Sequence, residues 1–281
     1  MIIDFHTHTF PDKIATQAIA HMQSMRGNAT CFNHGTSDDL RESMKTADVT
    51  YSVVLPVTTN PDKASHINDY SIAHTGQNGL IYFGGIHPDT SDWKAELDRI
   101  YQAGLKGVKL HPPEQHTDIN DPRYLRILER CGELGLIVTV HAGMDPGFPD
   151  QERCTPKMLR SALDQVGPVT LIAAHMGGIL YWEHVPEYLL DTNIYLDTAF
   201  SIGNIAQARK DGGTEPGARL MDETAFCRLV TLFGKERVLF GTDSPWNRQI
   251  YARKQIEALS LDQETKDHIF YKNACRLLNI K

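Results

Sequence analysis

The sequence lacks any closely spaced pair of cysteines. Its 281 residues contain five cysteines, an odd number, and no two of them form a Cys-x-x-Cys pair. This spacing indicates free thiols and not a disulfide framework. The five expected thiols are Cys31, Cys131, Cys154, Cys227 and Cys275.

Long hydrophobic runs are missing as well. No apolar stretch approaches the length of about 18 residues that a membrane-spanning helix needs. The first residues, Met-Ile-Ile-Asp-Phe-His, do not have the basic and then apolar regions of a secretory signal. We therefore expect no membrane association and a cytoplasmic location.

An excess of basic charge is also absent. The 28 Lys and Arg residues are outnumbered by 35 Asp and Glu residues, which gives a net charge of −7, and no Lys/Arg-rich run occurs. This argues against nucleic acid as a partner. Repeats, low-complexity tracts and linkers are missing too, so we expect one domain that spans residues 1–281.

Short apolar stretches recur along the whole chain and predict the strands of a sheet. Several are almost continuously hydrophobic, which is typical of parallel strands that are covered on both faces. The eight stretches are Ile2–His6, Tyr51–Val57, Leu80–His87, Gly107–His111, Leu136–His141, Val169–His175, Ile194–Thr198 and Arg237–Asp243.

Helical patterns lie between these stretches. Asp121 is placed to cap a helix that begins at Pro122 and ends before Gly135. Further helices are expected over residues 92–103, 222–233, 262–270 and 272–278. Eight strand and helix units without a Gly-x-Gly-x-x-Gly motif after the first strand predict an α/β fold of the (β/α)8 TIM-barrel type.

Two long connections, Thr9–Thr50 and Ala199–Asp222, are expected to contain extra helix or to act as lids.

Polar residues follow the apolar stretches at the predicted strand ends. Since the C-terminal strand ends of such a barrel form one rim, these residues are expected to converge there. His6 and His8 share one face of a strand and have the spacing of a metal clamp, although this pair alone is a weak signal. The residues at the strand ends are His6, His8, His87, His111, His141, His175 and Asp243.

Five motifs, taken together, resemble the amidohydrolase superfamily. The similarity covers essentially the full chain and is strongest to the amidohydrolase-related group that includes aminocarboxymuconate-semialdehyde decarboxylase. The motifs are DFHTH (residues 4–8), VHAG (140–143), AHMGG (174–178), GTDSPW (241–246) and NACRLL (273–278).

The resemblance implies a catalytic metal site of the metallo-dependent hydrolase type. His6, His8, His141 and Asp243 would hold one divalent metal ion, with zinc as the first candidate. Asp243 would also act as a proton shuttle, and His175 would contact the reacting water or substrate oxygen. Lys109 and His111, on one face of the fourth predicted strand, are assigned to substrate binding.

Some residues depart from related patterns. The stretch 84–88 and the Thr-Asp-Ser-Pro element also resemble TatD-type metal-dependent deoxyribonucleases, but the two glutamates of those enzymes are missing, with Lys109 or a neighbour and Thr242 at the matching positions. A nuclease activity is therefore not favoured. Lys109 leaves a second arrangement open, because some amidohydrolases carboxylate this lysine to bridge two metals.

Three functions are compatible with the residues. The first is hydrolysis of a small organic substrate by a metal-activated water, and the alternative is decarboxylation of a small carboxylic acid at the same site. The third is a non-catalytic barrel that only binds a metal or ligand. A homodimer is expected on general frequency.

The remaining candidates have ordinary explanations. Arg153 and Arg209 could bind a substrate carboxylate but are more typical of exposed arginines, and Trp246 could wall the pocket or cover the barrel edge. A further seven histidines are expected at the surface or in structural roles. They are His21, His34, His66, His74, His116, His184 and His268.

Overall fold

The computed structural model describes residues 1–25, 29–208 and 214–281 of the chain. Its backbone divides into two compact units. The first unit comprises Met1–Val53, Pro146–Phe148 and Asp197–Lys281, and the second comprises Val54–Asp145 and Pro149–Leu196. Both units contain strands and helices, and from β4 to β8 the second unit alternates between them as the sequence predicts.

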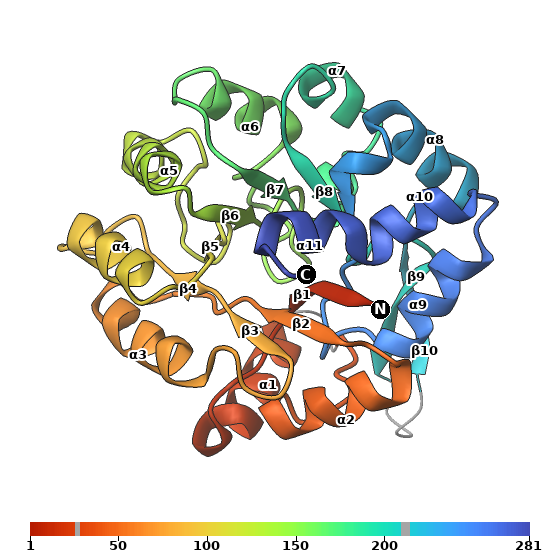
Figure 1. Ribbon diagram of the computed structural model, residues 1–281, viewed down its shortest axis with the longest axis horizontal. Coiled ribbons are helices and arrows are strands. Elements are labelled where there is room, and N and C mark those ends of the chain that lie inside the picture. Colours follow the sequence, from red (N-terminus) through yellow and green to blue (C-terminus); the bar gives the residue numbers. More distant parts are fainter. Residues whose placement is uncertain (26–28, 209–213) are drawn as a thin grey trace. The chain divides into compact units, whose positions relative to one another are not determined.

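The second unit contains a parallel sheet with the order β4-β5-β6-β7-β8. The register pairs Gly85 with Lys109 and Leu110 with Val140. In Figure 1 the helices α3 to α6 lie on the outer side of these strands. The elements are η1 (Pro61–Lys63), α3 (Ala64–His74), β3 (Leu80–Tyr82), β4 (Gly84–Gly85), α4 (Trp93–Gln102), β5 (Gly107–Leu110), α5 (Pro122–Leu134), β6 (Ile137–Val140), α6 (Pro156–Leu163), β7 (Leu171–Ala173), η2 (His175–Gly177), α7 (Val185–Leu189) and β8 (Tyr195–Asp197).

In the first unit, β1 runs between β2 and the segment that contains β11. Phe5 N–H donates to Phe240 O over 2.7 Å, and Thr198 N–H donates to Leu239 O on the other side of that segment. The elements are β1 (Ile3–Thr7), α1 (Asp12–Met25), α2 (Ser37–Ala47), β2 (Tyr51–Val54), β9 (Asn204–Ala208), β10 (Thr214–Arg219), α8 (Glu223–Phe233), η3 (Lys235–Arg237), β11 (Val238–Leu239), α9 (Gln249–Ala258), α10 (Gln263–Asp267), the π-helical segment η4 (His268–Lys272) and α11 (Asn273–Leu278).

Helix boundaries follow the capping residues. The Asp121 side chain accepts the N–H of Arg123, Pro122 is the first residue of α5, and Gly135 ends it with a φ of 69°. Asp222 caps α8 by accepting the N–H of Ala225. The predicted positions of these helices are confirmed.

The predicted strand over Leu80–His87 is two strands. Phe83 N–H donates to Val54 O, whereas Gly84 and Gly85 pair with β5. The chain changes its hydrogen-bonding neighbour at this point, and the continuous apolar sequence conceals the break.

The two long connections differ from each other. Thr9–Thr50 contains the helices α1 and α2, as expected. The second connection contains no helix among its described residues but an antiparallel pair, β9 and β10. Pro216 and Gly217 lie within β10 and disfavour a helix there.

The apolar strand residues of the second unit form its core. Val108, Val138, Ile172 and Leu196 have no exposed surface, which matches strands that are covered on both faces. All five cysteines are free thiols, as predicted.

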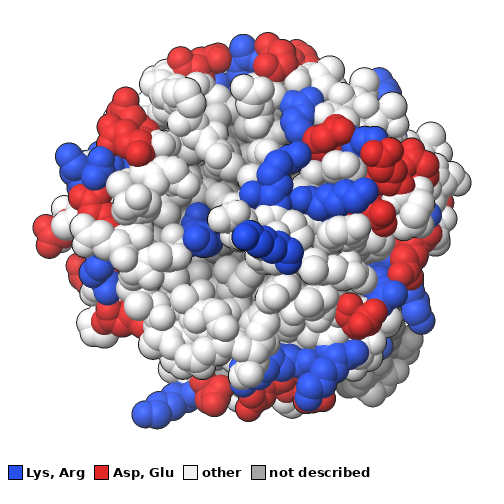
Figure 2. All heavy atoms as spheres, in the orientation of Figure 1, with Lys and Arg blue, Asp and Glu red and all other residues white. Residues whose placement is uncertain are grey.

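On the face shown in Figure 2, acidic and basic side chains lie side by side around the periphery. Among the described residues, every helix is too short or too polar to cross a membrane.

Candidate metal centre

In the first unit, three predicted metal ligands converge. The Nε2 atom of His8 lies 2.9 Å from Oδ1 of Asp243, and Nε2 of His6 lies 3.6 Å from the same oxygen. Ligands that sit about 2.1 Å from one ion are separated by about 3.0 to 3.5 Å. Both nitrogens therefore lie near the same carboxylate oxygen, and the chemistry of the three groups suits a divalent transition metal.

A carboxylate outside the predicted set fixes the orientation of His6. Its Nδ1 atom lies 2.8 Å from Oδ2 of Asp197, and both side chains are buried. Because Asp197 can only accept a hydrogen bond when ionised, His6 carries its proton on Nδ1 and keeps the Nε2 lone pair for a metal.

Backbone hydrogen bonds hold the two ligand segments together. Asp243 N–H donates to His6 O over 2.8 Å, and His8 N–H donates to Ser244 O over 2.7 Å. At Gly241 an added Cβ would lie 2.9 Å from Cβ of His6. Glycine is therefore required for the close approach of this segment to β1.

Asp4 forms a buried anchor beneath the cluster. Its carboxylate accepts hydrogen bonds from the Thr242 hydroxyl (2.6 Å), the Thr242 N–H (3.1 Å), the His6 N–H (3.1 Å) and Gln249 Nε2 (2.8 Å). Burial raises the pKa of the Asp4 carboxyl to about 7, although the hydrogen bonds from Thr242, Gln249 and His6 lower it. Asp4 thus links the strand that carries the histidines to the segment that carries Asp243.

The two residues that were assigned to proton transfer share an uncommon backbone conformation. Asp243 has a φ of 65° and His175 a φ of 58°. Left-handed conformations are infrequent for residues other than glycine and occur often at functional sites. The observation supports a special role for both residues.

In the second unit, the histidines that follow β5, β6 and β7 lie together. His175 Nε2 is 3.1 Å from His141 Nδ1, and the rings of His111 and His141 stack with centroids 4.3 Å apart. One of the two nitrogens in the His175–His141 contact must carry the hydrogen. His111, His141 and Asp145 also offer three ligand atoms within 4.8 Å of one another. The structure thus brings His111, His141 and His175 together.

Close backbone packing joins the segments that carry His141 and His175. Gly143 has a φ of 91°, and an added Cβ would lie 2.3 Å from the backbone nitrogen of Ile179. Gly143 and Ile179 form a parallel bridge. A side chain at position 143 would push these two segments apart.

Lys109 is a buried cation within β5. It is 1% exposed and lies opposite Thr139 of β6. Burial raises the pKa of the Cys154 thiol, and the positive charge of Lys109 partly counteracts this rise. As an ammonium group a lysine attracts the carboxylate of an acid, whereas only its neutral amine, with a free lone pair, adds to carbon dioxide and releases a proton.

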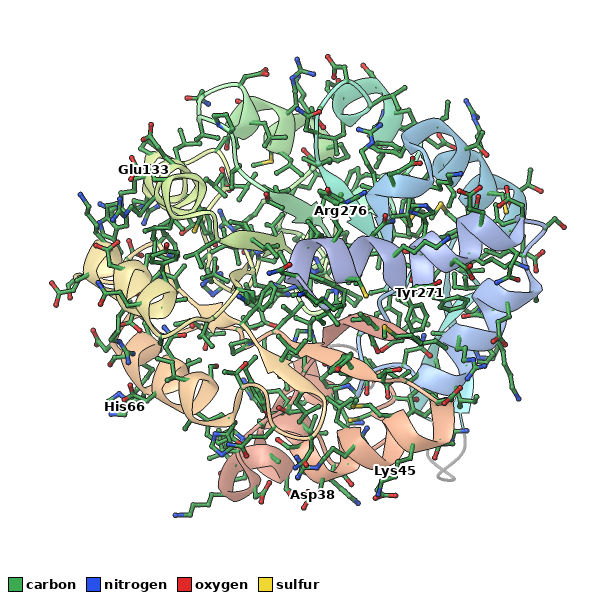
Figure 3. All side chains as sticks on the ribbon, in the orientation of Figure 1. Asp38, Lys45, His66, Glu133, Tyr271 and Arg276 are labelled. Carbon is green, nitrogen blue, oxygen red and sulfur yellow. The ribbon has the colours of Figure 1, made fainter. Side chains whose placement is uncertain are left out.

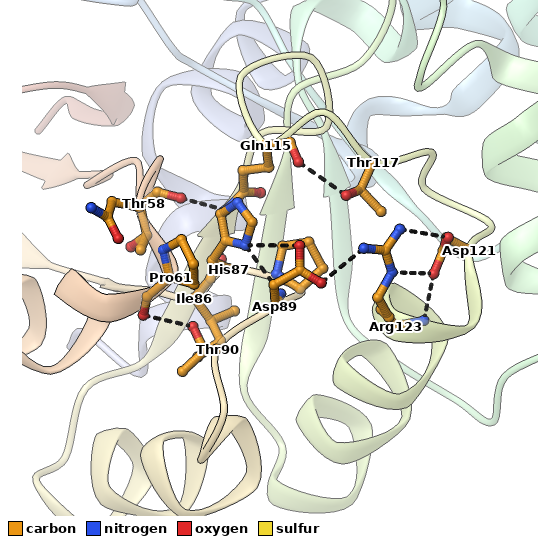
Figure 4. A network of polar contacts seen from close by, with 12 residues as sticks. Thr58, Pro61, Ile86, His87, Asp89, Thr90, Gln115, Thr117, Asp121 and Arg123 are labelled. Atoms are coloured by element: carbon orange, nitrogen blue, oxygen red, sulfur yellow. Dashed lines mark hydrogen bonds and ion pairs between the residues drawn. The ribbon is translucent and has the colours of Figure 1, made fainter.

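The loop after β4 holds His87 in one orientation (Figure 4). Its Nδ1 accepts the N–H of Asp89 over 3.0 Å, and the Asp89 carboxylate pairs with Arg123 at 2.8 Å. Arg123 in turn binds Asp121. Burial lowers the pKa of His87 more than Asp89 raises it.

The residues with ordinary explanations that the structure describes are exposed or half-buried, except for the buried Trp246. His66 points outward from α3 in Figure 3, and His21, His34, His116 and His184 are also exposed. His74 and His268 are half-buried. Arg153 pairs with Asp118 at 2.8 Å, whereas Arg209 lies outside the described residues. Trp246 is 5% exposed and packs on Ile19 and Ala29, so it covers an apolar cluster.

Several supporting residues were not singled out from the sequence. Asp197 ends an apolar stretch in the same way as His141 and Asp243, and this position was the available signal. Gln115 and Asp145 lie in loops beyond the strand ends and gave no such signal. Their importance depends on contacts with His111, which sequence patterns do not reveal.

Comparison with known proteins identifies the family. The sequence model of the Amidohydrolase family matches residues 3–280. The chain belongs to the amidohydrolase family. It is therefore a metal-dependent enzyme of the hydrolase or decarboxylase type, acting on small molecules, as the motifs predicted.

Individual relatives extend this assignment. The chain is 24% identical over 241 residues to the 2-amino-3-carboxymuconate-6-semialdehyde decarboxylase of Dictyostelium discoideum, covering 78% of this chain and 67% of that protein. It is similar in structure to an uncharacterized TIM-barrel protein from Bordetella bronchiseptica (TM-score 0.74, 16% identity, 99% and 98% of the two chains). It is also similar to the 5-carboxyvanillate decarboxylase of Sphingomonas paucimobilis (0.71, 14%, 100% and 99%). The predicted (β/α)8 fold is confirmed by these likenesses.

Proposed function

We propose that the protein is a metal-dependent decarboxylase of a small carboxylic acid. The observation that carries the proposal is the convergence of His6 Nε2, His8 Nε2 and Asp243 Oδ1. The similarity to two named decarboxylases supports decarboxylation over the hydrolysis that the sequence alone put first. Decarboxylation is therefore the first candidate, and hydrolysis the second.

The proposed ligands of the metal are His6, His8, His141 and Asp243. His141 directly follows β6 as His8 follows β1, and Asp243 lies four residues beyond the end of β11. In a (β/α)8 barrel the C-terminal strand ends form a common active-site face, and this supports one shared site. Zinc is the first ion to test, because imidazole and carboxylate ligands suit it.

The bound metal would polarise a substrate oxygen or lower the pKa of a water molecule. The protein groups would then orient the acid and move protons. In decarboxylation the bond from carbon to the carboxylate breaks, carbon dioxide leaves, and the carbon that retains the electron pair takes up one proton. Asp243 or His175 would deliver this proton, since each is a titratable group that the proposal places at the centre.

Lys109 is proposed to contribute to substrate binding, whereas His111, assigned to the same role from the sequence, has both ring nitrogens next to protein groups and is proposed to shape the site through its neighbours. Lys109 is buried within β5, and a lysine ammonium group attracts the carboxylate of an acid. The alternative, in which a carboxylated Lys109 bridges two metals, predicts two ions per chain. Metal analysis separates the two arrangements.

Hydrolysis by the same residues is the second candidate, and the description of the matching family favours it. In that reaction Asp243 would accept a proton from the attacking water, and His175 would stabilise the reacting oxygen. Decarboxylation and hydrolysis would use the same residues, so only the product distinguishes the two reactions.

The decisive experiment supplies the metal-loaded protein with a panel of aromatic and enoic acids and with lactones and amides. We expect release of carbon dioxide from at least one acid and its loss in His175→Ala and Asp243→Asn. Ring opening or deacylation without carbon dioxide would establish the hydrolase instead. Binding of acids without turnover, equally in His175→Ala, would contradict both reactions.

Four further expectations stay predictions. They are a homodimer, the cytoplasmic location, the absence of a nucleic-acid partner and the single domain over residues 1–281. Size-exclusion chromatography with light scattering would test the first, and a nucleic-acid binding assay the third.

A further inference from the structure

His111 stacks face to face against His141 at the C-terminal end of the sheet. The register of β5 and β6 pairs Leu110 with Val140, which places the two histidines side by side. Their ring planes differ by 20°. We infer that His111 is a positioning residue that sets the ring plane of His141, an inference that rests on the proposed role of His141 as a metal ligand.

Hydrogen bonds fix His111 on its other sides. Its backbone N–H donates to Gln115 Oε1 over 2.9 Å, and its Nδ1 accepts the N–H of Glu114 over 3.4 Å. Its Nε2 lies 3.4 Å from Oδ2 of Asp145. Because both ring nitrogens are engaged, rotation of the ring would break these contacts.

Gln115 supplies a rigid support for this arrangement (Figure 4). Its Nε2 donates to Thr58 O and to Ile86 O, each over 2.7 Å. Its Oε1 accepts the hydroxyl of the buried Tyr124 over 2.5 Å, besides the N–H of His111. The amide is 2% exposed and all its hydrogen bonds run to protein groups, so it joins several loop and strand ends firmly.

The stack matters because an imidazole binds a metal along a lone pair that lies in the ring plane. The contact with His175 Nε2 restrains His141 at Nδ1 but leaves its ring able to tilt about that contact. The face of His111 blocks this tilt. Partners of this kind in the outer shell of a metal site hold the ligand in its binding orientation.

A second cation between His111, His141 and Asp145 is the competing interpretation, since their ligand atoms lie within 4.8 Å. The stacked geometry disfavours it. Lone pairs in two nearly parallel planes do not point at a common ion between the rings. A supporting role for His111 is the arrangement that the ring geometry fits better.

The test measures cobalt(II) binding by chelator competition and records the visible spectrum of the cobalt-loaded protein. We expect His111→Ala to weaken binding by about 10- to 100-fold and to shift the spectrum. His111→Phe keeps a flat ring and should restore most of the affinity. His66→Ala, on the exposed side of α3, is the matched control and should behave like the wild type.

Three results would overturn the inference in folded variants. They are wild-type affinity in His111→Ala, affinity in His111→Phe as weak as in His111→Ala, and a stoichiometry that falls from two ions to one in His111→Ala. Circular dichroism verifies folding. If the proposed metal centre itself is wrong, His141→Ala would retain wild-type cobalt affinity. That result would contradict both the metal centre and the positioning role of His111.

Discussion

The Nδ1 atom of His6 lies 2.8 Å from Oδ2 of Asp197, and neither side chain is exposed beyond 1%. This contact determines which nitrogen of His6 faces Asp243. It also gives the proposed metal centre a carboxylate that orients a ligand without binding the ion itself.

Removal of Asp197 should therefore weaken the metal site while the ligands stay in place. We expect Asp197→Ala to lower metal affinity by about 10- to 100-fold, because His6 loses the partner that fixes its tautomer. Chelator competition measures the effect. Asp191→Ala, which removes a largely exposed carboxylate, is the control, and an equal loss in both variants would refute the orienting role.

Asp4 should contribute strongly to the stability of the fold. Asp4→Ala removes the acceptor of four buried hydrogen bonds, and we expect the free energy of unfolding to fall by about 3 kcal/mol or more. Asp4→Asn should cost less, because its amide oxygen can still accept part of these hydrogen bonds. Denaturant unfolding measures both, with the exposed Asp38→Ala as the control. Equal losses in Asp4→Asn and Asp4→Ala would contradict this explanation.

His87 should make the protein less stable in acid. Burial lowers the pKa of the folded His87 below its ordinary value of 6.5, so the unfolded chain binds more protons than the folded one. The contribution of His87 to stability is complete above pH 6.5. It is lost as the pH falls through the pKa that His87 has in the folded protein.

The comparison of wild type with His87→Gln between about pH 7 and pH 5 tests this linkage. The free energy of unfolding should decrease more steeply in the wild type as the pH falls. His66→Gln should keep the wild-type slope. A wild-type slope in His87→Gln would show that His87 does not carry the effect.

Cys131 and Cys154 should be inert thiols in the native protein. Both are fully buried, and burial raises the pKa of Cys131 to about 12. A colorimetric thiol reagent should modify them only after unfolding, as peptide mapping would show. Labelling of either residue in the folded protein at the rate of the more exposed Cys275 would contradict the described burial.

The sequence predicted the fold and the site to different depths. The strand ends could be predicted because apolar runs stop at polar residues such as His141 and Asp243. The break at Phe83 could not be predicted, because it arises from a change of hydrogen-bonding neighbour within one apolar run. The β9–β10 pair was missed because long connections were expected to contain extra helix or to act as lids.

Supporting residues were the least predictable part of the site. The role of Asp197 depends on its distance to His6, which is 191 residues away in the sequence. Likewise, Gln115 acquires its importance from backbone oxygens of Thr58 and Ile86. Such contacts depend on the packing of distant segments, so local patterns carry little information about them.

We propose that His6, His8, His141 and Asp243 hold one divalent ion. Anomalous diffraction from crystals of the zinc-loaded protein would locate this ion. We predict one strong peak per chain, within about 2.3 Å of a nitrogen or oxygen atom of each of the four residues. A peak that lacks His141 or Asp243 as a ligand, or no peak near His6 and His8, would contradict the account.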